Sequence, residues 1–334
     1  MRECDLAFPD LLLSWYDGNA RKMPWRVPPK FNKRADPYHV WLSEVMLQQT
    51  TVAAVESYFR KFVTLWPDVQ TLASADDAAV MAQWAGLGYY ARARNLLKCA
   101  RALAAMDAFP ETEAELRLLP GIGPYTAAAI AAIAFDQKAT VVDGNVERVM
   151  ARYFAETEPL PAVKPMLFQH AAKLTPKTRP GDYAQAVMDL GATICTPRNP
   201  ACGICPVCDS CQARRKGIAA QLPNRLSKPE KPIRVGQVWI EAKPDGALVI
   251  QVRPKSGLLG GMLGLPTSGW DGSVSPAPKG NWQSIGEVRH TFTHFHLRLK
   301  VLRNEYRLNG TDLDLTAFPT LFRKALLLAL NLKA

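Results

Sequence analysis

The sequence lacks the features that membrane, secreted and repeat proteins have in common. No stretch of about 18 apolar residues is free of charged side chains, so we expect no transmembrane helix. Near the N-terminus, charges flank a short Leu run and no small-residue cleavage site follows, which argues against a secretory signal. Internal repeats and low-complexity tracts are also absent. These absences lead us to expect a cytoplasmic bacterial protein.

Cysteine is scarce outside one short segment. Cys4 and Cys99 stand alone, whereas the other five of the seven cysteines lie between residues 195 and 211. Dispersed cysteines in a small secreted chain are typical of disulfides, but such crowding is typical of a metal centre in a reducing compartment.

The composition favours a globular protein with a polyanionic partner. The chain has 334 residues, 48% of them hydrophobic, which is enough for two domains with their own cores. Its formal net charge is +11 and its pI is about 9.4. A surplus of positive charge favours binding to nucleic acid or to an acidic membrane surface.

The pattern of residues changes once along the chain. Alanine-rich segments with apolar residues at three- and four-residue spacing predict a mostly α-helical domain over residues 1–216. Basic residues interspersed with prolines indicate a linker over 217–233. Alternating β-branched and aromatic residues, followed by a C-terminal helix, predict a small α+β domain over 234–334.

The cysteine run CTPRNPACGICPVCDSC is dense enough to hold a metal centre. Two sets of four ligands are possible: the first has intervals of six, two and five residues, and the second has two throughout. The first set is Cys195, Cys202, Cys205 and Cys211, and the second is Cys202, Cys205, Cys208 and Cys211. An iron–sulfur cluster fits this density better than zinc, which usually joins two short pairs across a longer span, and better than disulfides.

The segment LRLLPGIGPYTAAA, residues 116–129, predicts two helices joined by a tight hairpin. The first helix should end at the Leu-Pro pair and the second should begin at Pro124. Gly121 and Gly123 let backbone N–H groups approach a phosphate, and a helix N-terminus favours negative charge. We therefore predict contact with the DNA backbone, with an ordinary helical connection as the alternative.

Two carboxylates are candidates for acid–base chemistry. Glu44 lies in VWLSEVMLQQT, where apolar neighbours would desolvate the carboxyl and raise its pKa, as a general acid requires. A salt-bridged helix residue is the alternative. Asp143 lies in ATVVDGNVERVM, where its position alone predicts a helix N-cap, and Asn145 has the same alternative.

Six segments in order resemble the catalytic domain of the MutY adenine glycosylases, across roughly residues 5–215. They are PWR at 24–26, PYHVWLSEVMLQQT at 37–50, GLGYYARARNL at 86–96, LPGIGPYTA, VVDGNVERV and the cysteine run. The resemblance implies a helix–hairpin–helix glycosylase of the endonuclease III superfamily with a 4Fe–4S cluster. It also implies the six–two–five ligand set, which leaves Cys208 out.

The resemblance also implies roles in breaking the bond between base and sugar. Glu44 would protonate adenine, and Asp143 would stabilise the sugar cation. Tyr125 stands where bifunctional relatives resembling endonuclease III have a nucleophilic lysine, so the chain should be a monofunctional glycosylase. Tyr125 and Asn145 would line the pocket around the scissile bond.

Three further residues are expected to contact DNA by the same resemblance. Tyr89 would wedge into the base stack, although it could also be a core aromatic residue. Gln48 lies in the adjacent segment that reads the duplex, and Gln185 would contact the flipped adenine. Flipping is needed because the reacting atoms are hidden within the duplex.

The C-terminal part resembles the MutT-like (Nudix-fold) domain with which this family recognises 8-oxoguanine opposite adenine. The match rests on RPKSGLLGGMLGLP and on RHTFTHFHL, in which Phe292, Thr293 and His294 replace the usual Phe-Ser-His. Threonine keeps the hydroxyl group but adds a methyl group. The acidic helix of magnesium-binding Nudix enzymes is missing from the sequence. Metal binding by His290, His294 and His296 is a weaker alternative because no carboxylate accompanies them.

Together these features predict a monomeric base excision repair enzyme. It should excise adenine opposite 8-oxoguanine or guanine in double-stranded DNA and associate with the nucleoid. The alternatives are a thymine or pyrimidine mismatch glycosylase, a non-catalytic iron–sulfur DNA sensor, and nucleotide hydrolysis by the C-terminal domain.

Overall fold

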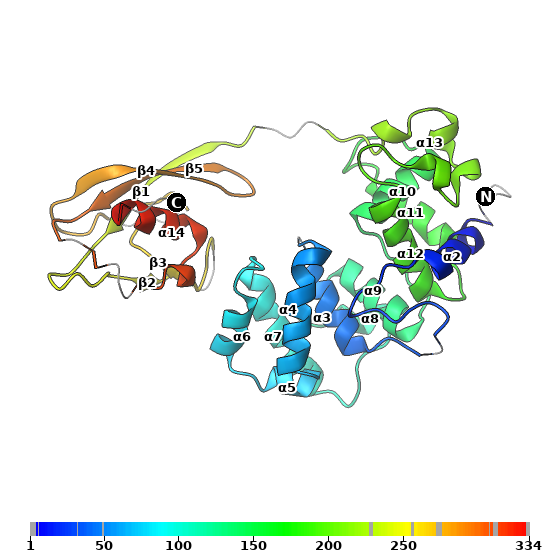
Figure 1. Ribbon diagram of the computed structural model, residues 1–334, viewed down its shortest axis with the longest axis horizontal. Coiled ribbons are helices and arrows are strands. Elements are labelled where there is room, and N and C mark those ends of the chain that lie inside the picture. The colour runs from blue at the N-terminus through cyan, green and yellow to red at the C-terminus, as the bar shows by residue number, and fades with distance from the viewer. Residues whose placement is uncertain are drawn as a thin grey trace. The chain divides into compact units, whose positions relative to one another are not determined.

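The computed structural model describes residues 5, 7–31, 33–48, 50–226, 230–254, 257–271, 276–306, 308–309 and 313–331. Cys4, residues 227–229 of the expected linker and residues 255–256 of the Gly-rich segment therefore lie outside the described residues. The chain divides into two compact units, Met1–Leu226 and Ser227–Ala334. We call them the helical unit and the β unit and describe each by itself (Figure 1).

The helical unit is built from helices of one to four turns, as the sequence predicts. They are α2 (Phe8–Asn19), α3 (Pro37–Leu47), α4 (Val52–Leu65), α5 (Val69–Ala73), α6 (Asp77–Trp84), α7 (Tyr90–Ala104), α8 (Glu113–Leu116), α9 (Pro124–Phe135), α10 (Gly144–Phe154), α11 (Lys164–Leu174), α12 (Pro180–Thr193) and α13 (Gln212–Arg215). Side-chain caps at Asp36, Thr51, Asp68 and Asp76 begin four of them by accepting backbone N–H bonds. No helix among the described residues is both long and apolar enough to cross a membrane.

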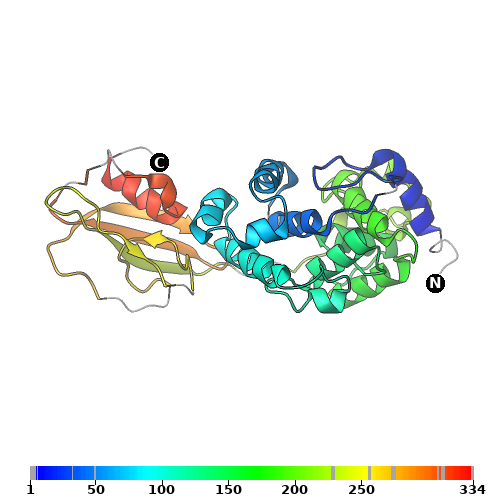
Figure 2. The ribbon, with the colours of Figure 1, turned by 90° about the horizontal axis from the view of Figure 1, so that it is seen from below.

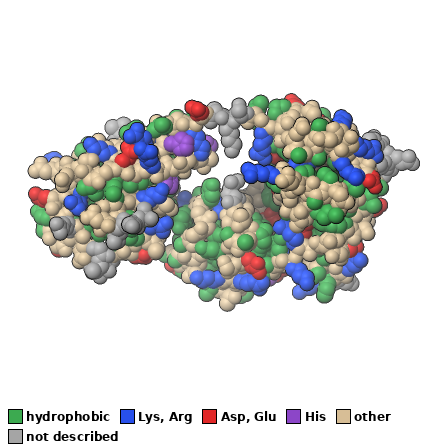
Figure 3. Space-filling view, turned by 45° about the horizontal axis from the view of Figure 1, so that its top comes forward, with side chains coloured by type: hydrophobic (Ala, Val, Ile, Leu, Met, Phe, Trp, Pro, Cys, Tyr) green, Lys and Arg blue, Asp and Glu red, His purple; other side chains and the backbone are tan. Residues whose placement is uncertain are grey.

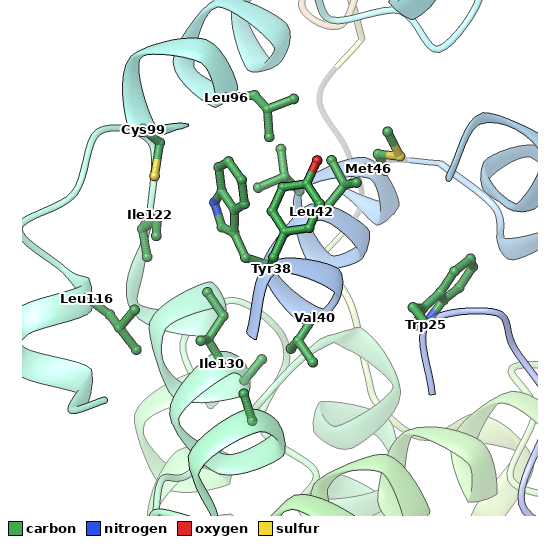
Figure 4. Packing of buried hydrophobic residues seen from close by; sticks show 14 of the residues in the cluster. Trp25, Tyr38, Val40, Leu42, Met46, Leu96, Cys99, Leu116, Ile122 and Ile130 are labelled. Atoms are coloured by element: carbon green, nitrogen blue, oxygen red, sulfur yellow. The ribbon is translucent and has the colours of Figure 1, made fainter. Parts of the chain in front are cut away.

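The helical unit contains two hydrophobic cores. The first is formed by α3 to α9, and Figure 4 shows Tyr38 and Leu42 of α3 near Leu96 of α7. The second is formed by α2 together with α10, α11 and α12, which lie more than 120 residues further along the chain. Burial of apolar surface in each core is the main stabilising term.

Helix α9 lies between these two groups of helices and packs on α3, α8 and α12 (Figure 1). Its alanine-rich sequence PYTAAAIAAIAF is buried on nearly every side. Small side chains allow neighbouring backbones to approach closely: a Cβ built at Gly181 of α12 would lie 2.4 Å from the Ala132 carbonyl oxygen. The composition of α9 therefore sets how closely the two groups of helices pack.

The hairpin before α9 differs from the sequence prediction at one end. Helix α9 begins at Pro124, as predicted, with Gly123 at its N-cap. Helix α8, however, ends at Leu116, three residues before the expected Leu-Pro pair. The residue before a proline is disfavoured in helical conformation, and here the chain leaves the helix earlier through turns at 117–121.

The cysteine run follows α12 as a compact loop. Two short 3₁₀ turns, η1 (Cys202–Ile204) and η2 (Cys208–Ser210), separate the cysteines, and a third, η3 (Ala219–Gln221), follows α13. Ala219 and Leu222 are buried against Ala213, so the first part of the expected linker packs on the helical unit. Basic composition alone did not reveal these apolar contacts, because only three linker residues make them: Ile218, Ala219 and Leu222.

The β unit contains a three-stranded sheet in the order β1-β5-β4. Strand β1 (Ile233–Ile240) pairs in parallel with β5 (His296–Arg303), and β4 (Gln283–Thr291) pairs antiparallel with β5. The shorter strands β2 (Gln251–Val252) and β3 (Leu263–Gly264) form a separate two-stranded ladder. Helix α14 (Thr320–Ala329) covers one face of the larger sheet (Figure 2), and Phe322 and Leu326 fill the core between them.

Candidate active site

A cavity of about 950 Å³ opens in the helical unit between its two hydrophobic cores. Every residue of this unit that the sequence singled out for catalysis or DNA contact lines it: Glu44, Gln48, Tyr89, Gly121, Gly123, Tyr125, Asp143, Asn145 and Gln185. Figure 3 shows a hollow on this unit with Lys and Arg side chains at its rim. The cavity is thus the candidate active site, and its volume accommodates a purine base with its sugar.

Glu44 lies on α3 and reaches the cavity while being only 7% exposed. Burial raises the pKa of its carboxyl to about 7, and the nearby Asp143 charge adds to the effect. A hydrogen bond with Tyr125 and the positive charge of Arg26 act in the opposite direction. Near neutral pH the carboxyl therefore remains partly protonated, which suits a proton donor.

Tyr125 is the second residue of α9 and lies beside Glu44. Its hydroxyl group hydrogen-bonds with the Glu44 carboxyl and lies 3.6 Å from Sδ of Met188. Burial, together with the Glu44 and Asp143 charges, keeps the pKa of this hydroxyl well above its ordinary value. The phenol is therefore a neutral hydrogen-bond donor at this position.

Asp143 is the N-cap of α10 and also lines the cavity. The same carboxylate therefore caps the helix and belongs to the candidate site. Its carboxylate accepts backbone N–H bonds of 2.9 Å from Asn145 and 2.8 Å from Val146. The Asn145 side-chain amide donates a third bond of 2.8 Å to it. These donors hold the carboxylate in one orientation at the positive end of the helix.

A buried arginine on the next turn of α10 holds Asn145 in place. Arg148 donates 2.8 Å to the Asn145 side-chain oxygen and 2.6 Å to the Gly191 carbonyl oxygen. Its Nε also donates 2.7 Å to the carbonyl oxygen of Cys195. Gly191 approaches so closely that an added Cβ would lie 2.7 Å from the Cβ of Asn145. The cysteine loop, α12 and the candidate catalytic carboxylate are thus joined through one side chain.

An ion-pair network supports another wall of the cavity. The fully buried Asp189 of α12 pairs with Arg21 at 2.6 Å and with Arg26 at 2.8 Å. Both arginines belong to the segment that connects α2 to the first core, and both line the cavity. The Arg26 charge acts to lower the pKa of Glu44, but the effect of burial is larger and the pKa stays raised.

The loop carrying Tyr89 is held in an unusual backbone conformation. Tyr89 has φ of +49° and follows Gly86 and Gly88, which also have positive φ, and its ring is 56% exposed. Gly86 has φ of +102°, a conformation that favours glycine, and an added Cβ would lie 2.3 Å from the Tyr58 hydroxyl oxygen. An exposed aromatic ring held on a tight loop is suited to insertion between bases.

Arg92 joins this loop to the segment after α3. Its guanidinium lies 5.3 Å from the Tyr89 ring centroid and donates to the carbonyl oxygens of Val45, Met46 and Gln48. The side chain of Gln48 also donates 3.3 Å to the Thr126 hydroxyl at the start of α9. Tyr89 and Gln48 are therefore positioned relative to each other by one arginine.

The remaining predicted residues of this unit occupy the walls of the cavity. Gly121 has φ of +78°, and an added Cβ would lie 2.8 Å from the Cβ of Asn95, so the hairpin requires glycine there. Gly123 precedes α9 without a side-chain cap, which leaves backbone N–H groups for an anion. Gln185 is 6% exposed and donates 3.3 Å to the Gly181 carbonyl oxygen within α12.

All five clustered cysteines line a second, smaller cavity beside Arg152. The Arg152 guanidinium donates 3.3 Å to Sγ of Cys195. Four of the cysteines pack against the neighbouring hydrophobic cores: Cys195, Cys202, Cys205 and Cys211. Cys208 packs against neither of these cores, and its thiol donates 3.4 Å to the exposed Asp209.

The donor set of this cavity suits an iron–sulfur cluster. In the part of the chain that the structure describes, no three His, Cys, Asp or Glu side chains converge closely enough for a single metal ion. Four Cys thiolates are the usual ligands of such a cluster. Thiols around one small cavity, with a guanidinium beside them, therefore fit a cluster of net negative charge.

In the β unit, the hairpin between β4 and β5 presents the three residues expected to recognise 8-oxoguanine. Thr293 and His294 are exposed at its tip, and the Phe292 N–H donates 2.9 Å to the Phe295 carbonyl oxygen. The Phe292 ring stacks on Phe295 and on Trp270, with centroids 4.8 and 5.5 Å apart. The aromatic stack anchors the hairpin and leaves the Thr293 hydroxyl free to meet a ligand.

Sequence reasoning did not assign several residues of the site: Arg21, Arg26, Arg92, Arg148, Met188 and Asp189. Arg26 lies within the PWR segment, and Arg92 within GLGYYARARNL, so both were inside recognised motifs. Their roles depend on partners far along the chain, such as Asp189 for Arg26, and spacing does not reveal such partners.

Two family models match the chain. Residues 42–176 match the HhH-GPD superfamily base excision DNA repair protein, and residues 237–328 match the NUDIX domain. The first match covers α3 to α11, and the second covers most of the β unit.

Curated relatives match most of the chain. The human adenine DNA glycosylase is 37% identical over 88% of this chain, which spans 66% of that protein's length. The mouse adenine DNA glycosylase is 38% identical over 88% of this chain and 70% of its own length. The adenine DNA glycosylase of Mycolicibacterium smegmatis is 41% identical over 64% of this chain and 71% of its own.

Solved structures resemble the helical unit. A thermostable thymine-DNA glycosylase is 29% identical with a TM-score of 0.57, covering 64% of this chain and 98% of that chain. A non-covalent endonuclease III–DNA complex is 20% identical with a TM-score of 0.52, covering 65% of this chain and 99% of that chain. The latter similarity establishes a shared fold.

Proposed function

This chain belongs to the adenine DNA glycosylases, and we propose that it excises adenine mispaired with 8-oxoguanine or guanine. As a member of that family it is a hydrolase of N-glycosyl bonds in base excision repair. The observation that carries the proposal is the pair of unlike carboxyl groups in one cavity. Glu44 is buried with a pKa of about 7, and Asp143 is held by three hydrogen-bond donors.

The two carboxyl groups would act on different parts of the bond. Glu44 donates its proton to a ring nitrogen of the flipped adenine, so that the base leaves with the electrons of the glycosidic bond. Asp143 stabilises the positive charge that develops on the sugar. Asn145 orients Asp143, and a water molecule then adds to C1′ of the sugar and releases a proton that restores the protonated Glu44 carboxyl. Flipping is supported by the volume of the cavity and by the exposed Tyr89 ring, which can fill the vacated space.

Tyr125 supports a monofunctional reaction. A lysine amine at this position could attack C1′ and form a Schiff base, but a phenol with a raised pKa cannot. The Tyr125 hydroxyl instead hydrogen-bonds with Glu44 and adjusts the acidity of that residue. The expected product is an abasic site in an intact strand.

Recognition of the opposite base is proposed for the β4–β5 hairpin. The exposed Thr293 hydroxyl and His294 ring can hydrogen-bond with the edge of 8-oxoguanine, and Phe292 anchors them. In the helical unit, Gln48, Gly121 and Gly123 would contact the duplex and its backbone, and Gln185 would line the adenine pocket.

A 4Fe–4S cluster is proposed as the cofactor, with Cys195, Cys202, Cys205 and Cys211 as its ligands. The support is the shared cavity and the packing of these four thiols against the neighbouring cores. When bound, the cluster would hold the four cysteines of the loop after α12 together. The chain's own contribution is the Arg148 bond to the Cys195 carbonyl oxygen, which connects this loop to Asn145. We further propose that the protein acts as a monomer and works at the bacterial nucleoid.

A panel of duplexes with one defined mismatch tests the proposal. Adenine opposite 8-oxoguanine, adenine opposite guanine, thymine opposite guanine and a fully paired duplex are each incubated with excess protein, and abasic sites are measured. We expect base excision to be fastest for adenine opposite 8-oxoguanine. Glu44→Gln should lower this excision rate by about 10²- to 10⁴-fold.

The panel also separates the alternatives. Cleavage confined to thymine would favour the mismatch specificity named for the thermostable structural relative. Binding without any cleavage, unchanged in Glu44→Gln, would favour a non-catalytic sensor. Either result contradicts the proposed function.

A further inference from the structure

Positively charged side chains gather around the β4–β5 hairpin of the β unit. A pocket of about 620 Å³ lies beside the hairpin, lined by Arg289, His290, His296, Arg298 and Lys324 together with small and aliphatic residues. None of the described residues that line it is acidic. Figure 3 shows Lys, Arg and His side chains together on this side of the unit.

Two of the arginines face each other across the strand pair. Arg289 of β4 and Arg298 of β5 are direct partners in the antiparallel register, where like charges are destabilising. Both bind the single carboxylate of Glu287, at 3.0 Å and 2.9 Å. The three side chains together keep one positive charge that Glu287 cannot neutralise.

The other cations near the hairpin are bonded to carbonyl groups. Lys324 of α14 donates 3.3 Å to the Arg289 carbonyl oxygen, and Lys231 donates 3.0 Å to that of Phe292. Arg234 donates 3.2 Å to the Trp270 carbonyl oxygen and lies 4.2 Å from the Phe295 ring centroid. Within the described residues, none of these three forms an ion pair, so the positive charge around the hairpin is largely uncompensated.

We propose that this pocket binds a backbone phosphate of the DNA strand whose oxidised base the hairpin reads. The inference rests on the proposed function. Thr291 and His296 line the pocket at the two ends of the hairpin, and Thr293 and His294 lie at the tip between them. A nucleotide held at the tip would therefore bring a neighbouring phosphate to Arg298 and Lys324. Guanidinium and ammonium groups bind such oxygens, and the contact fixes register without reading sequence.

The salt dependence of DNA binding by the full chain tests the proposal. The duplex carries 8-oxoguanine opposite adenosine with a 2′-fluoro substituent, which slows cleavage because fluorine destabilises the sugar cation. Affinity is measured at several salt concentrations between about 50 and 200 mM. The logarithm of the DNA association constant falls as the logarithm of the salt concentration rises, so the slope is negative. We expect Arg298→Gln and Lys324→Gln each to make this slope less steep by about 1.

Lys300→Gln is the matched control. Lys300 lies two residues beyond Arg298 on the same exposed face of β5 and does not line the pocket. Its removal should leave the slope unchanged. Equal decreases for all three variants would indicate a diffuse field, and unchanged slopes for Arg298→Gln and Lys324→Gln would indicate no phosphate contact. Either result overturns the proposal.

Two further experiments serve as controls. One distinguishes a DNA phosphate from a free nucleotide, and the other distinguishes a failure of the phosphate contact from a failure of the proposed function. If Arg298→Gln abolishes binding of dGTP to the full chain but leaves the DNA slope unchanged, the pocket takes free nucleotides, which overturns the assignment to DNA. The same slopes are measured with guanine in place of 8-oxoguanine, where the variants should show the same decrease. This binding measurement does not depend on catalysis, so it tests the phosphate contact even if the wild-type chain fails to excise adenine. A failure of the phosphate contact can therefore be distinguished from a failure of the proposed function.

Discussion

Glu44 and Tyr125 show how a single hydrogen bond can adjust an acid. Burial raises the pKa of Glu44 to about 7, and the bond to Tyr125 lowers it from what burial alone would produce. Because the protonated form is the one that donates, the single-turnover rate should fall as pH rises through about 7. The contribution of Glu44 to the free energy of unfolding also falls as pH rises. A raised carboxyl pKa favours the folded state at low pH, and this effect is lost as pH rises through 7.

Tyr125→Phe removes that hydrogen bond but keeps the ring. We expect the falling part of the pH–rate profile to move to higher pH, because the interaction that lowers the pKa of Glu44 is gone. The measurement is single-turnover adenine excision between about pH 5 and 9. A profile that stays in place, or moves to lower pH, would show that Glu44 is not the group that titrates.

The cysteines pose a second question at the residue scale, because the sequence allows two sets of four. Cys195→Ser should lower bound iron and the visible absorption of the purified protein, whereas Cys208→Ser should leave both unchanged. The reason is that Cys195 packs against the second core and accepts a bond from Arg152, while Cys208 bonds to an exposed aspartate. The reverse pattern would assign the two–two–two set.

At the scale of elements, the site depends on how closely α10 and α12 pack. A Cβ added at Gly191 of α12 would lie 2.7 Å from the Cβ of Asn145 and 3.2 Å from its backbone. Gly191→Ala should therefore displace Asn145 and the adjoining Asp143. We expect a loss of about 1–3 kcal/mol in the free energy of unfolding, together with a lower excision rate.

Gly18→Ala is the control for this prediction. Gly18 lies within α2 and has no neighbouring atom within 4 Å of an added Cβ, so its replacement should be neutral or slightly stabilising. Thermal unfolding and single-turnover kinetics measure both effects. If Gly191→Ala behaved like Gly18→Ala, contact between α12 and Asn145 would have no part in the activity.

At the scale of the whole molecule, the two units have separate cores. A chain ending at Leu226 keeps every described residue of the candidate active site and loses the β4–β5 hairpin. It should fold and excise adenine opposite guanine, but its preference for 8-oxoguanine over guanine should fall. Kinetics on the two duplexes measure that ratio, and an unchanged preference would place recognition of the oxidised base in the helical unit.

Much of the fold followed from local pattern. The helical and β-rich parts, the start of α9 at Pro124 and the strands of the β4–β5 hairpin agree with the sequence predictions because caps, prolines and alternation act over a few residues. The end of α8 at Leu116 did not follow, because competition between a helix and a turn before a proline is decided by only a few contacts.

By itself, the sequence determined which chemical groups the protein has and in what order. The motifs that contain Glu44, Tyr125, Asp143 and the cysteines identify the family, and those residue types limit the chemistry. Only the tertiary structure decided how these groups act on one another. It packs α2 against α10 and α12, which brings Arg26 to Asp189 across more than 160 residues, and it places the Arg26 charge where it acts on Glu44. A pKa, an ion pair and a cavity depend on distance in space, and spacing along the chain does not encode that distance.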